Sequence, residues 1–372
     1  MKIKWAFFIV LTAFLVTIHS ASTDLRTGTS EIDLVRDKTV LDERDFAVID
    51  AFLKKSVGEF LTTKDFTSVA KLRTVILKNQ NSNQPNQSQY AGQFSKSAYK
   101  YISQALEQAL ILRPQERQTR VIINLLILID NLQDIQLADL AMAKLNDENM
   151  AVRYWAVHAV TNPGISMRLG DAQNRKLALQ IIEQLKKIID GSTPEILGLI
   201  AEFASNLNLT EGQELLLQIA DLRIQKYADW TVQYERLEIA ILKLLESKIA
   251  VSSQSPGGPA ASNPANPAAA RRFAQLYSFA IERYIKGTNL NDTQRQQLIT
   301  VMAEIEEKCI SKLLGRQQSS IQNAIAEKNM TALEAERTRL LAEVLPSRLG
   351  FDYGTNTDGS KRTTPLPLPD KP

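Results

Sequence analysis

The sequence predicts an all-α fold of helix pairs stacked in series, and three observations support this prediction. Apolar residues recur every three or four positions over most of residues 41–345, the spacing of one helix face. No long segment alternates with the two-residue period of a half-buried strand. Candidate first helices begin at Asp134, Asp171 and Thr210, with separations of 37 and 39 residues. A period of about 40 residues is typical of an α-solenoid, in which each antiparallel helix pair covers the next.

The first 22 residues have the pattern of a secretory signal peptide. Lys2 and Lys4 precede a nearly continuous apolar run from Trp5 to Ile18, and small residues at 20–22 suit a cleavage site. The run is shorter than the roughly 20 residues of a full membrane span, which makes an uncleaved anchor helix the weaker alternative. We therefore expect an exported chain, periplasmic or secreted, with no membrane span after the signal is removed.

The segments that follow the signal predict an N-terminal unit of two helices. Residues 23–40 are polar and mixed, and are expected to form a flexible arm. Residues 41–78 carry two amphipathic patterns and predict a helical hairpin. The polar stretch 79–89, NQNSNQPNQSQ, predicts a loop.

Residues 94–250 predict the helical repeats. Pro114 and Pro194 fit the first position of a helix, where the missing N–H costs little. Thr210 with Gln213 matches a capping box, and Asp229 is expected to cap another helix. The expected helices are 94–112, 115–130, 134–145, 149–161, 171–189, 194–207, 210–227 and 229–249.

One hairpin, residues 134–161, resembles the HEAT repeats of the armadillo-like α-solenoids. Its second helix carries the sequence DENMAVRYWAVHAV, with Asp147 in the turn, the Val152–Arg153 pair, and alanines at 156 and 159. The resemblance implies that Asp147 and Arg153 are structural and brace the turns. The sequence departs from the pattern at Glu148 and Met150, where prolines are common, and the neighbouring pairs keep only the period. Divergent tetratricopeptide or armadillo-like pairs are the alternatives.

Beyond the repeats, composition marks a linker, a helical segment and a tail. Residues 251–268 are rich in Pro, Gly, Ser and Asn and predict a linker. Residues 269–345 predict a C-terminal helical bundle, whose last helix is expected to start at a capping box of Thr331 and Glu334. Residues 346–372, which end in TTPLPLPDKP, predict a disordered or polyproline II tail.

Few residues offer catalytic or metal chemistry. His158 is the one histidine left after the signal, and Cys309 is the one cysteine, so a His/Cys zinc site or a histidine-based catalytic group is not expected. We interpret His158 as a partly buried structural residue and Cys309 as a core residue. No Gly-rich phosphate loop or EF-hand spacing occurs, so no cofactor and no metal is predicted.

The balance of basic and acidic residues also narrows the classes of partner that the chain is expected to bind. Without Lys2 and Lys4 the chain has 42 basic and 41 acidic residues. Nucleic-acid binding needs a clustered basic excess, so no nucleic-acid partner is expected.

Carboxylates can act without histidine, which keeps one enzymatic alternative open. Secreted α-toroid enzymes that cleave glycans use pairs of Asp or Glu. Glu304, Glu306 and Glu307 lie close together, but with Lys308 beside them we interpret them as a solvated helix face.

Tyr227, Trp230 and Tyr234 are the candidate partner-binding residues. Tyr and Trp are favoured at the energetic centres of protein interfaces, although hairpin packing would also explain the three residues. The sequence therefore favours an exported, non-catalytic scaffold that binds an unidentified protein. The alternatives are the glycan-active enzyme and a cell-wall or surface-layer component.

Overall fold

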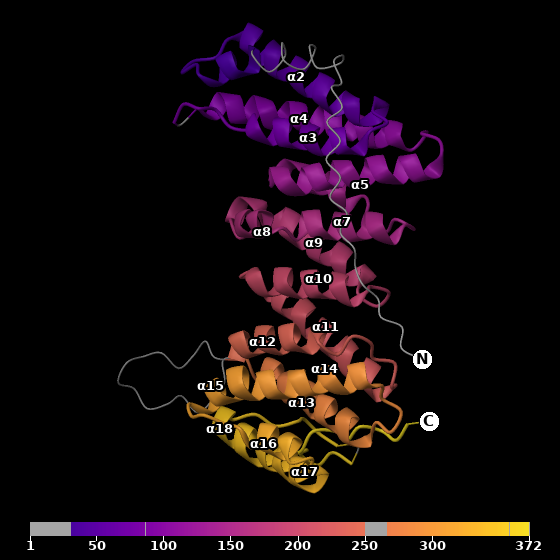
Figure 1. Cartoon of the computed structure of the whole chain (residues 1–372). Helices are drawn as coiled ribbons and strands as arrows, with labels where there is room; N and C mark the ends of the chain where they lie inside the picture. The colour runs from indigo at the N-terminus through magenta and orange to yellow at the C-terminus, as the bar shows by residue number, and fades with distance from the viewer. Residues whose placement is uncertain (1–30, 86, 250–265, 357, 372) are drawn as a thin grey trace. The chain divides into compact units, whose positions relative to one another are not determined.

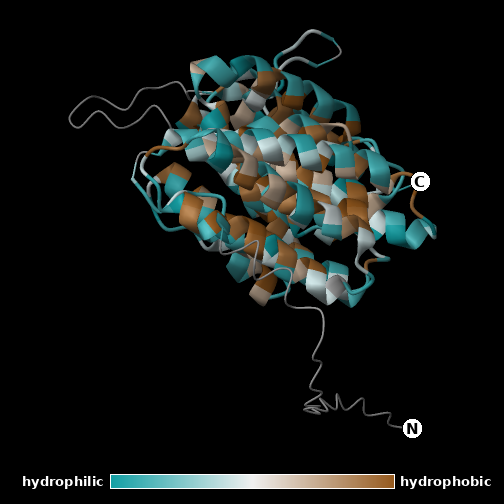
Figure 2. Ribbon diagram, turned by 90° about the horizontal axis from the view of Figure 1, so that it is seen from above, coloured by the Kyte–Doolittle hydropathy of each residue, from teal (hydrophilic) through white to brown (hydrophobic). Residues whose placement is uncertain are grey.

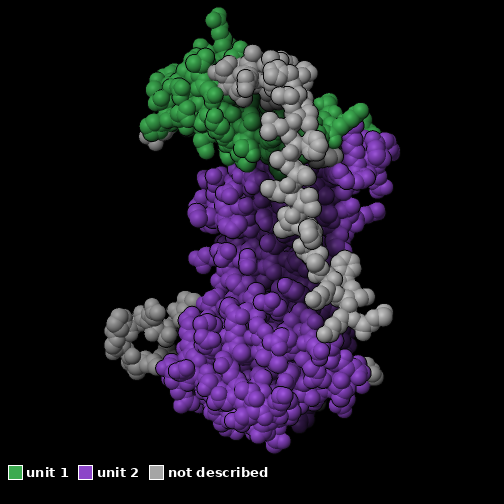
Figure 3. Space-filling model, in the orientation of Figure 1, with its two compact units in different colours: residues 1–111 green, residues 112–372 purple. Residues whose placement is uncertain are grey.

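A computed structural model describes residues 31–85, 87–249, 266–356 and 358–371. The chain divides into two compact units, residues 1–111 and residues 112–372, which are coloured separately in Figure 3. The predicted signal, residues 1–22, lies outside the described residues, as does most of the predicted linker.

Unit 1 contains the helices α2 (Glu43–Thr62), α3 (Phe66–Lys78) and α4 (Ser88–Ala109). Asp42 and Asp45 form a capping box at the start of α2, which satisfies backbone N–H groups that the helix leaves unpaired. Helix α2 packs against both α3 and α4. Helix α4 was predicted to begin the repeats, but it completes this first unit.

The prediction of a flexible arm over residues 23–40 is wrong for the part that the structure describes, residues 31–40. Residues 31–36 are helical, and Ile32 and Val35 are buried. The Arg36 guanidinium donates to the Asn81 carbonyl at 2.8 Å and to Asn83 Oδ1 at 2.8 Å. Arg36 therefore fixes the described part of the arm to residues 79–83, a long-range contact that local composition does not reveal.

In its described residues, unit 2 is helical apart from a C-terminal tail that begins at Gly350. Its helices up to the gap at residue 250 are α5 (Gln115–Leu132), the turn Ile135–Leu137 with α6 (Ala138–Met142), α7 (Met150–Val160), α8 (Pro163–Leu169), the turn Ala172–Asn174 with α9 (Arg175–Ile188), α10 (Pro194–Asn206), α11 (Thr210–Ala228) and α12 (Leu237–Ile249).

After that gap come α13 (Pro267–Lys286), α14 (Asp292–Ile305), a π-helical turn (Glu306–Ile310), α15 (Ser311–Leu314), α16 (Ser320–Ala326), α17 (Met330–Thr338), a second π-helical turn (Arg339–Val344) and α18 (Leu345–Leu349). Among the described residues, β-structure is limited to one isolated bridge between Thr355 and Lys361.

Two layers of helices run through unit 2 in serial order (Figure 1). The second helices of the pairs pack in the order α5, α7, α10, α12, α14, and the first helices pack in the order α9, α11, α13. The two layers also pack against each other, within a pair as α13 does with α14, and between neighbouring pairs as α10 does with α11 and α12 with α13. This arrangement confirms the predicted HEAT-like α-solenoid, because each pair covers its neighbours.

In the matched hairpin, Asp147 and Arg153 both make structural contacts, and these contacts lie within a single turn. The Arg153 guanidinium donates to the Asp147 carbonyl at 2.8 Å, and Asp147 Oδ1 accepts from the Asn149 N–H at 3.0 Å. Both side chains therefore stabilise the turn between α6 and α7.

Hydrophobic side chains lie where helices meet within each unit, and polar residues cover the outward sides (Figure 2). Cys309 is buried in this core, as predicted, and burial raises the pKa of its thiol to about 12. None of the described helices is both long and apolar enough to span a membrane.

Several predicted helix starts differ from the structure. Helix α8 follows Asn162 directly, where a stop was expected, because Pro163 occupies its first turn and Asn162 accepts from the Gly164 N–H. Helix α11 starts at Thr210, so that residue lies inside the helix and forms no cap. Helix α17 is capped by Asn329, which precedes the predicted Thr331 box.

The tail and linker also differ from their predictions. Helix α13 begins at Pro267, inside the predicted linker, with Asn266 as its cap. Residues 346–371 are not a disordered tail, since α18 continues to Leu349 and Tyr353 and Leu368 are buried. Alternating prolines exclude helix but do not prevent packing.

Candidate interaction surface

The loop between α11 and α12, residues 229–236, is held by two buried arginines. Arg223 of α11 donates to Glu238 Oε1 of α12 at 2.6 and 2.9 Å and to the Gln233 carbonyl at 3.1 Å. Arg283 of α13 pairs with Glu235 at 3.2 Å. The four charged side chains are buried, and charges in such surroundings require partners. The two ion pairs therefore fix the path of the loop.

The three predicted partner-binding residues do not form one exposed patch. Trp230 and Tyr234 both have a φ of 56°, so the chain leaves the helix after Ala228 and helical spacing no longer relates them. Tyr227 is fully buried, which excludes it as a surface anchor. Trp230 is half-buried and donates its indole N–H to the Pro369 carbonyl at 2.9 Å. Tyr234 alone is well exposed, at 48%.

Tyr227 and Trp230 still share one partner. The Arg283 guanidinium carbon lies 5.8 Å from the Tyr227 ring centroid and 5.6 Å from the Trp230 ring centroid. These are cation–π distances, so the two rings help to hold the buried charge. Burial also raises the pKa of the Tyr227 hydroxyl well above its ordinary value.

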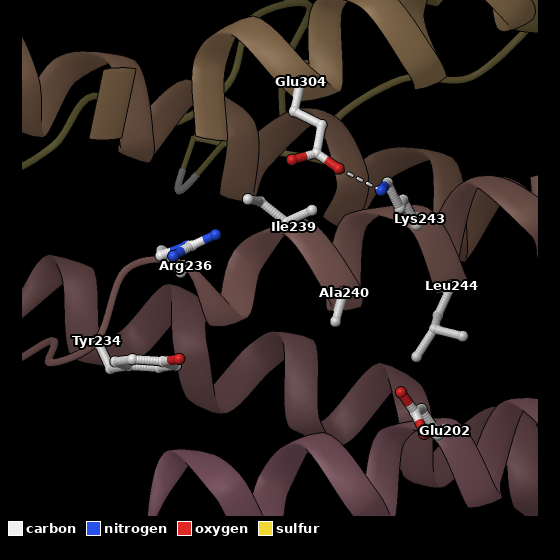
Figure 4. A pocket seen from close by; sticks show the side chains of 8 residues that line it. All are labelled: Glu202, Tyr234, Arg236, Ile239, Ala240, Lys243, Leu244 and Glu304. Atoms are coloured by element: carbon white, nitrogen blue, oxygen red, sulfur yellow. Dashed lines mark hydrogen bonds and ion pairs between the residues drawn. The ribbon is translucent and has the colours of Figure 1, made fainter. Parts of the chain in front are cut away.

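Tyr234 lines an open hollow of about 590 Å³ on the second-helix layer (Figure 4). Most of the lining comes from three consecutive second helices, with Glu202 on α10 and Glu304 on α14 on either side of α12. The loop before α12 adds Tyr234 and Arg236. The α12 residues are spaced by three or four positions and so share one helix face. The residues that line the hollow are Glu202, Tyr234, Arg236, Ile239, Ala240, Lys243, Leu244 and Glu304.

The hollow combines an apolar floor with charges of both signs. Lys243 and Glu304 form an ion pair between α12 and α14, and their side chains are 43% and 33% exposed. Water screens such a pair, so it contributes about 1 kcal/mol or less to stability. Ile239, Ala240 and Leu244 supply the apolar contact area. The lining therefore places apolar and charged groups side by side on one open surface.

His158 has the structural role predicted for it. Its Nδ1 lies 3.0 Å from Asp130 Oδ1, and its side chain is 31% exposed. Asp130 is buried and also accepts from Asn162 Nδ2 at 2.7 Å. The contact ties α7 to α5 and to the start of α8.

The three glutamates of residues 304–307 are not one solvated face. Glu306 is fully buried and accepts from the backbone N–H groups of Ile321 and Gln322, each at 2.8 Å. It therefore caps the first turn of α16, and burial raises its pKa. Glu304 lines the hollow, whereas Glu307 is exposed and pairs with Lys308.

The sequence prediction missed most of the hollow. Glu202, Lys243 and Glu304 lie far apart along the chain and match no motif, so only the stacking of α10, α12 and α14 brings them together. In the described part of the chain, no three His, Cys, Asp or Glu side chains are placed to hold a metal ion.

No known family model matches the sequence, and no curated protein matches it. Among solved structures, the chain resembles Kap121p, with 14% identity over 88% of this chain and 34% of that chain and a TM-score of 0.36. Kap121p bound to the extreme C-terminus of the protein phosphatase Cdc14p gives 15% identity over 88% of this chain and 35% of that chain, with a TM-score of 0.34.

An engineered protein gives 12% identity over 87% of this chain and 86% of that chain, with a TM-score of 0.25. This chain spans about a third of the length of the Kap121p structures that it matches. These likenesses concern the fold alone.

Proposed function

We propose that the chain is an exported, non-catalytic scaffold that binds another protein through the hollow on its second-helix layer. The observation that carries the proposal is the lining of that hollow, where exposed Tyr234 lies with an aliphatic floor and four charged residues. Apolar centres with a polar rim are typical of protein interfaces, and Tyr and Arg are favoured among their strongest contacts.

The openness of the hollow favours binding over glycan hydrolysis. Glu202 and Glu304 both line it, but Glu304 is held in an ion pair with Lys243. A glycosidase needs one carboxyl group kept protonated and a second placed across an enclosed sugar site. We therefore favour the scaffold over the α-toroid enzyme.

Export is part of the proposal and depends on the sequence pattern of residues 1–22. N-terminal sequencing of the chain from the extracellular or envelope fraction should give Thr23 as the first residue. A chain that keeps Met1 and stays inside the cell would contradict export. Recovery in the cell-wall fraction would favour the surface-layer alternative.

Site-specific photo-crosslinking tests the hollow as a protein-binding surface. A photoreactive phenylalanine at position 240, in the floor of the hollow, should give a discrete crosslinked product with one protein in intact cells. Ile239→Glu should remove that product, because it places a charge on the apolar floor.

The matched control carries the same photoreactive group at Gln218, an exposed residue on α11 in the first-helix layer. This position should not give the product seen at position 240. Identical products from both positions would mean that the hollow is not a specific binding surface.

A further inference from the structure

The C-terminal tail crosses unit 2 alongside α13, although these segments are far apart in sequence (Figure 1). Four side chains hold its last residues, and we call them the tail-binding surface: Trp230, Gln275, Glu282 and Lys286. Leu368 is 1% exposed in this contact, whereas Leu366 is 45% exposed.

The tail-binding surface contacts the backbone of the tail at alternate residues. Gln275 accepts from the Leu366 N–H at 2.8 Å and donates to the Leu366 carbonyl at 3.0 Å. Glu282 accepts from the Leu368 N–H at 2.9 Å, and Lys286 donates to the Leu368 carbonyl at 2.7 Å. The Trp230 indole completes the set at Pro369.

These contacts match the alternation of proline and leucine in the segment 365–369, PLPLP. Proline has no backbone N–H, so Leu366 and Leu368 supply the only two N–H donors of the segment. Both donors are bonded to side-chain oxygens of the surface. Proline also restricts the unbound segment to extended conformations, which lowers the entropy lost on binding.

Three of the four side chains of the surface also have partners outside the tail. Glu282 is buried and also pairs with Arg337 of α17 at 3.1 Å, and Lys286 pairs with Glu282 at 3.1 Å. Trp230 lies against the Arg283 guanidinium, which is fixed by Glu235. Pre-arranged donors and acceptors of this kind bind a peptide at a lower conformational cost.

We propose that this surface is a binding site for extended proline-rich segments of other proteins, and that the chain's own residues 365–369 occupy it in cis. A partner segment with proline and aliphatic residues in alternation would bind by displacing the tail. Aromatic-lined surfaces commonly bind proline-rich peptides, because the ligand is already extended.

Because the tail is attached to the chain, it sets the affinity or concentration that a partner needs in order to displace it. A tethered segment competes at an effective concentration in the millimolar range. A partner must therefore bind tightly or be present at high local concentration before the tail is displaced. None of the four side chains of the tail-binding surface lines the hollow, so the two proposals can be tested separately.

A labelled peptide of residues 363–372 tests the site in trans. In full-length chain carrying Leu368→Asp, the tail should leave its site, and the labelled peptide should bind at least about tenfold more tightly than to the native chain. A peptide that carries aspartate at position 368 should not bind. Fluorescence polarisation measures both.

Leu366→Asp is the matched control, because Leu366 is 45% exposed and its side chain is not needed for docking. This variant should bind the labelled peptide as weakly as the native chain does. Adding Gln275→Ala to the Leu368→Asp chain should weaken peptide binding by about tenfold, because two hydrogen bonds are lost.

Hydrogen exchange on the native chain gives a readout that does not depend on any variant folding. Excess unlabelled peptide should accelerate exchange of the Leu366 and Leu368 amides, because both leave their acceptors when the tail is displaced. Unchanged exchange at saturating peptide would overturn the proposal. So would a folded Leu368→Asp chain that binds the peptide no better than the native chain.

Discussion

The hollow and the tail-binding surface are built from the same helix pairs, but they hold their charges differently. At the tail-binding surface, the buried Glu282 pairs with Arg337, and the neighbouring buried Arg283 pairs with Glu235. Arg223 and Glu238 form a third buried pair next to the loop 229–236. In the hollow, Lys243 and Glu304 pair with their side chains substantially exposed. Buried pairs fix geometry, because losing either partner leaves an unpaired charge in the core. Exposed pairs remain available to a ligand.

The largest effect is expected from breaking a buried pair. Arg223→Met keeps an unbranched side chain but leaves the Glu238 carboxylate without its cation. We expect the free energy of unfolding to fall by about 3 to 5 kcal/mol. Urea denaturation followed by tryptophan fluorescence measures it, since Trp155 and Trp230 both lie in unit 2.

The double variant Arg223→Met with Glu238→Leu is the control for that experiment. Replacing both charges by apolar groups should recover most of the lost stability, because no buried charge remains. If the single variant were as stable as the native chain, the buried pair would not hold the loop.

An intermediate effect is expected from pH, through Glu238. Burial is the main cause that raises the pKa of this carboxyl from 4.5 to about 7, and Arg223 opposes the rise. The folded chain then binds more protons at Glu238 than the unfolded chain does between these two pH values. The stability contributed by this group is therefore present below about pH 4.5 and is lost as the pH rises through 7.

Glu238→Gln isolates this contribution from the other titrating groups. The unfolding free energy of the native chain minus that of Glu238→Gln should decrease as the pH rises from 4.5 to 7, with both measured in urea. A difference that stays constant over this range would show that Glu238 keeps the same proton occupancy folded and unfolded.

The same contrast explains how much of the fold was visible in the sequence. The helices and their serial order were predictable, because apolar periodicity and a repeat of about 40 residues are local signals. The docked position of the tail was not predictable. The segment PLPLP has the composition of a disordered segment, and its docking depends on the distant residues Gln275 and Glu282. The prediction of a flexible arm is wrong for the same reason, because Arg36 contacts a loop that is distant in sequence.

The candidate site was visible only in part. The sequence predicts Tyr227, Trp230 and Tyr234 together as partner-binding residues, but of the three only Tyr234 is well exposed. Left-handed backbone at Trp230 and Tyr234 separates them, and no residue preference at these positions signals it. Glu202 and Glu304 reach the hollow only because the helices stack, so no spacing rule could have joined them.

The smallest effect on stability is expected at the exposed pair of the hollow. Lys243→Ala should lower the unfolding free energy by less than about 1 kcal/mol, because water already screens the pair. The same change should reduce crosslinking from position 240, since Lys243 is part of the surface offered to the partner.

Arg175→Ala provides the comparison, because Arg175 pairs with Glu211 at 3.5 Å, is 58% exposed and lies outside the hollow. Its effect on stability should be equally small, with crosslinking from position 240 unchanged. If Lys243→Ala destabilised the chain as much as Arg223→Met does, the hollow would be held by its charges, as the loop is. The distinction between charges that fix geometry and charges that face a partner would then fail.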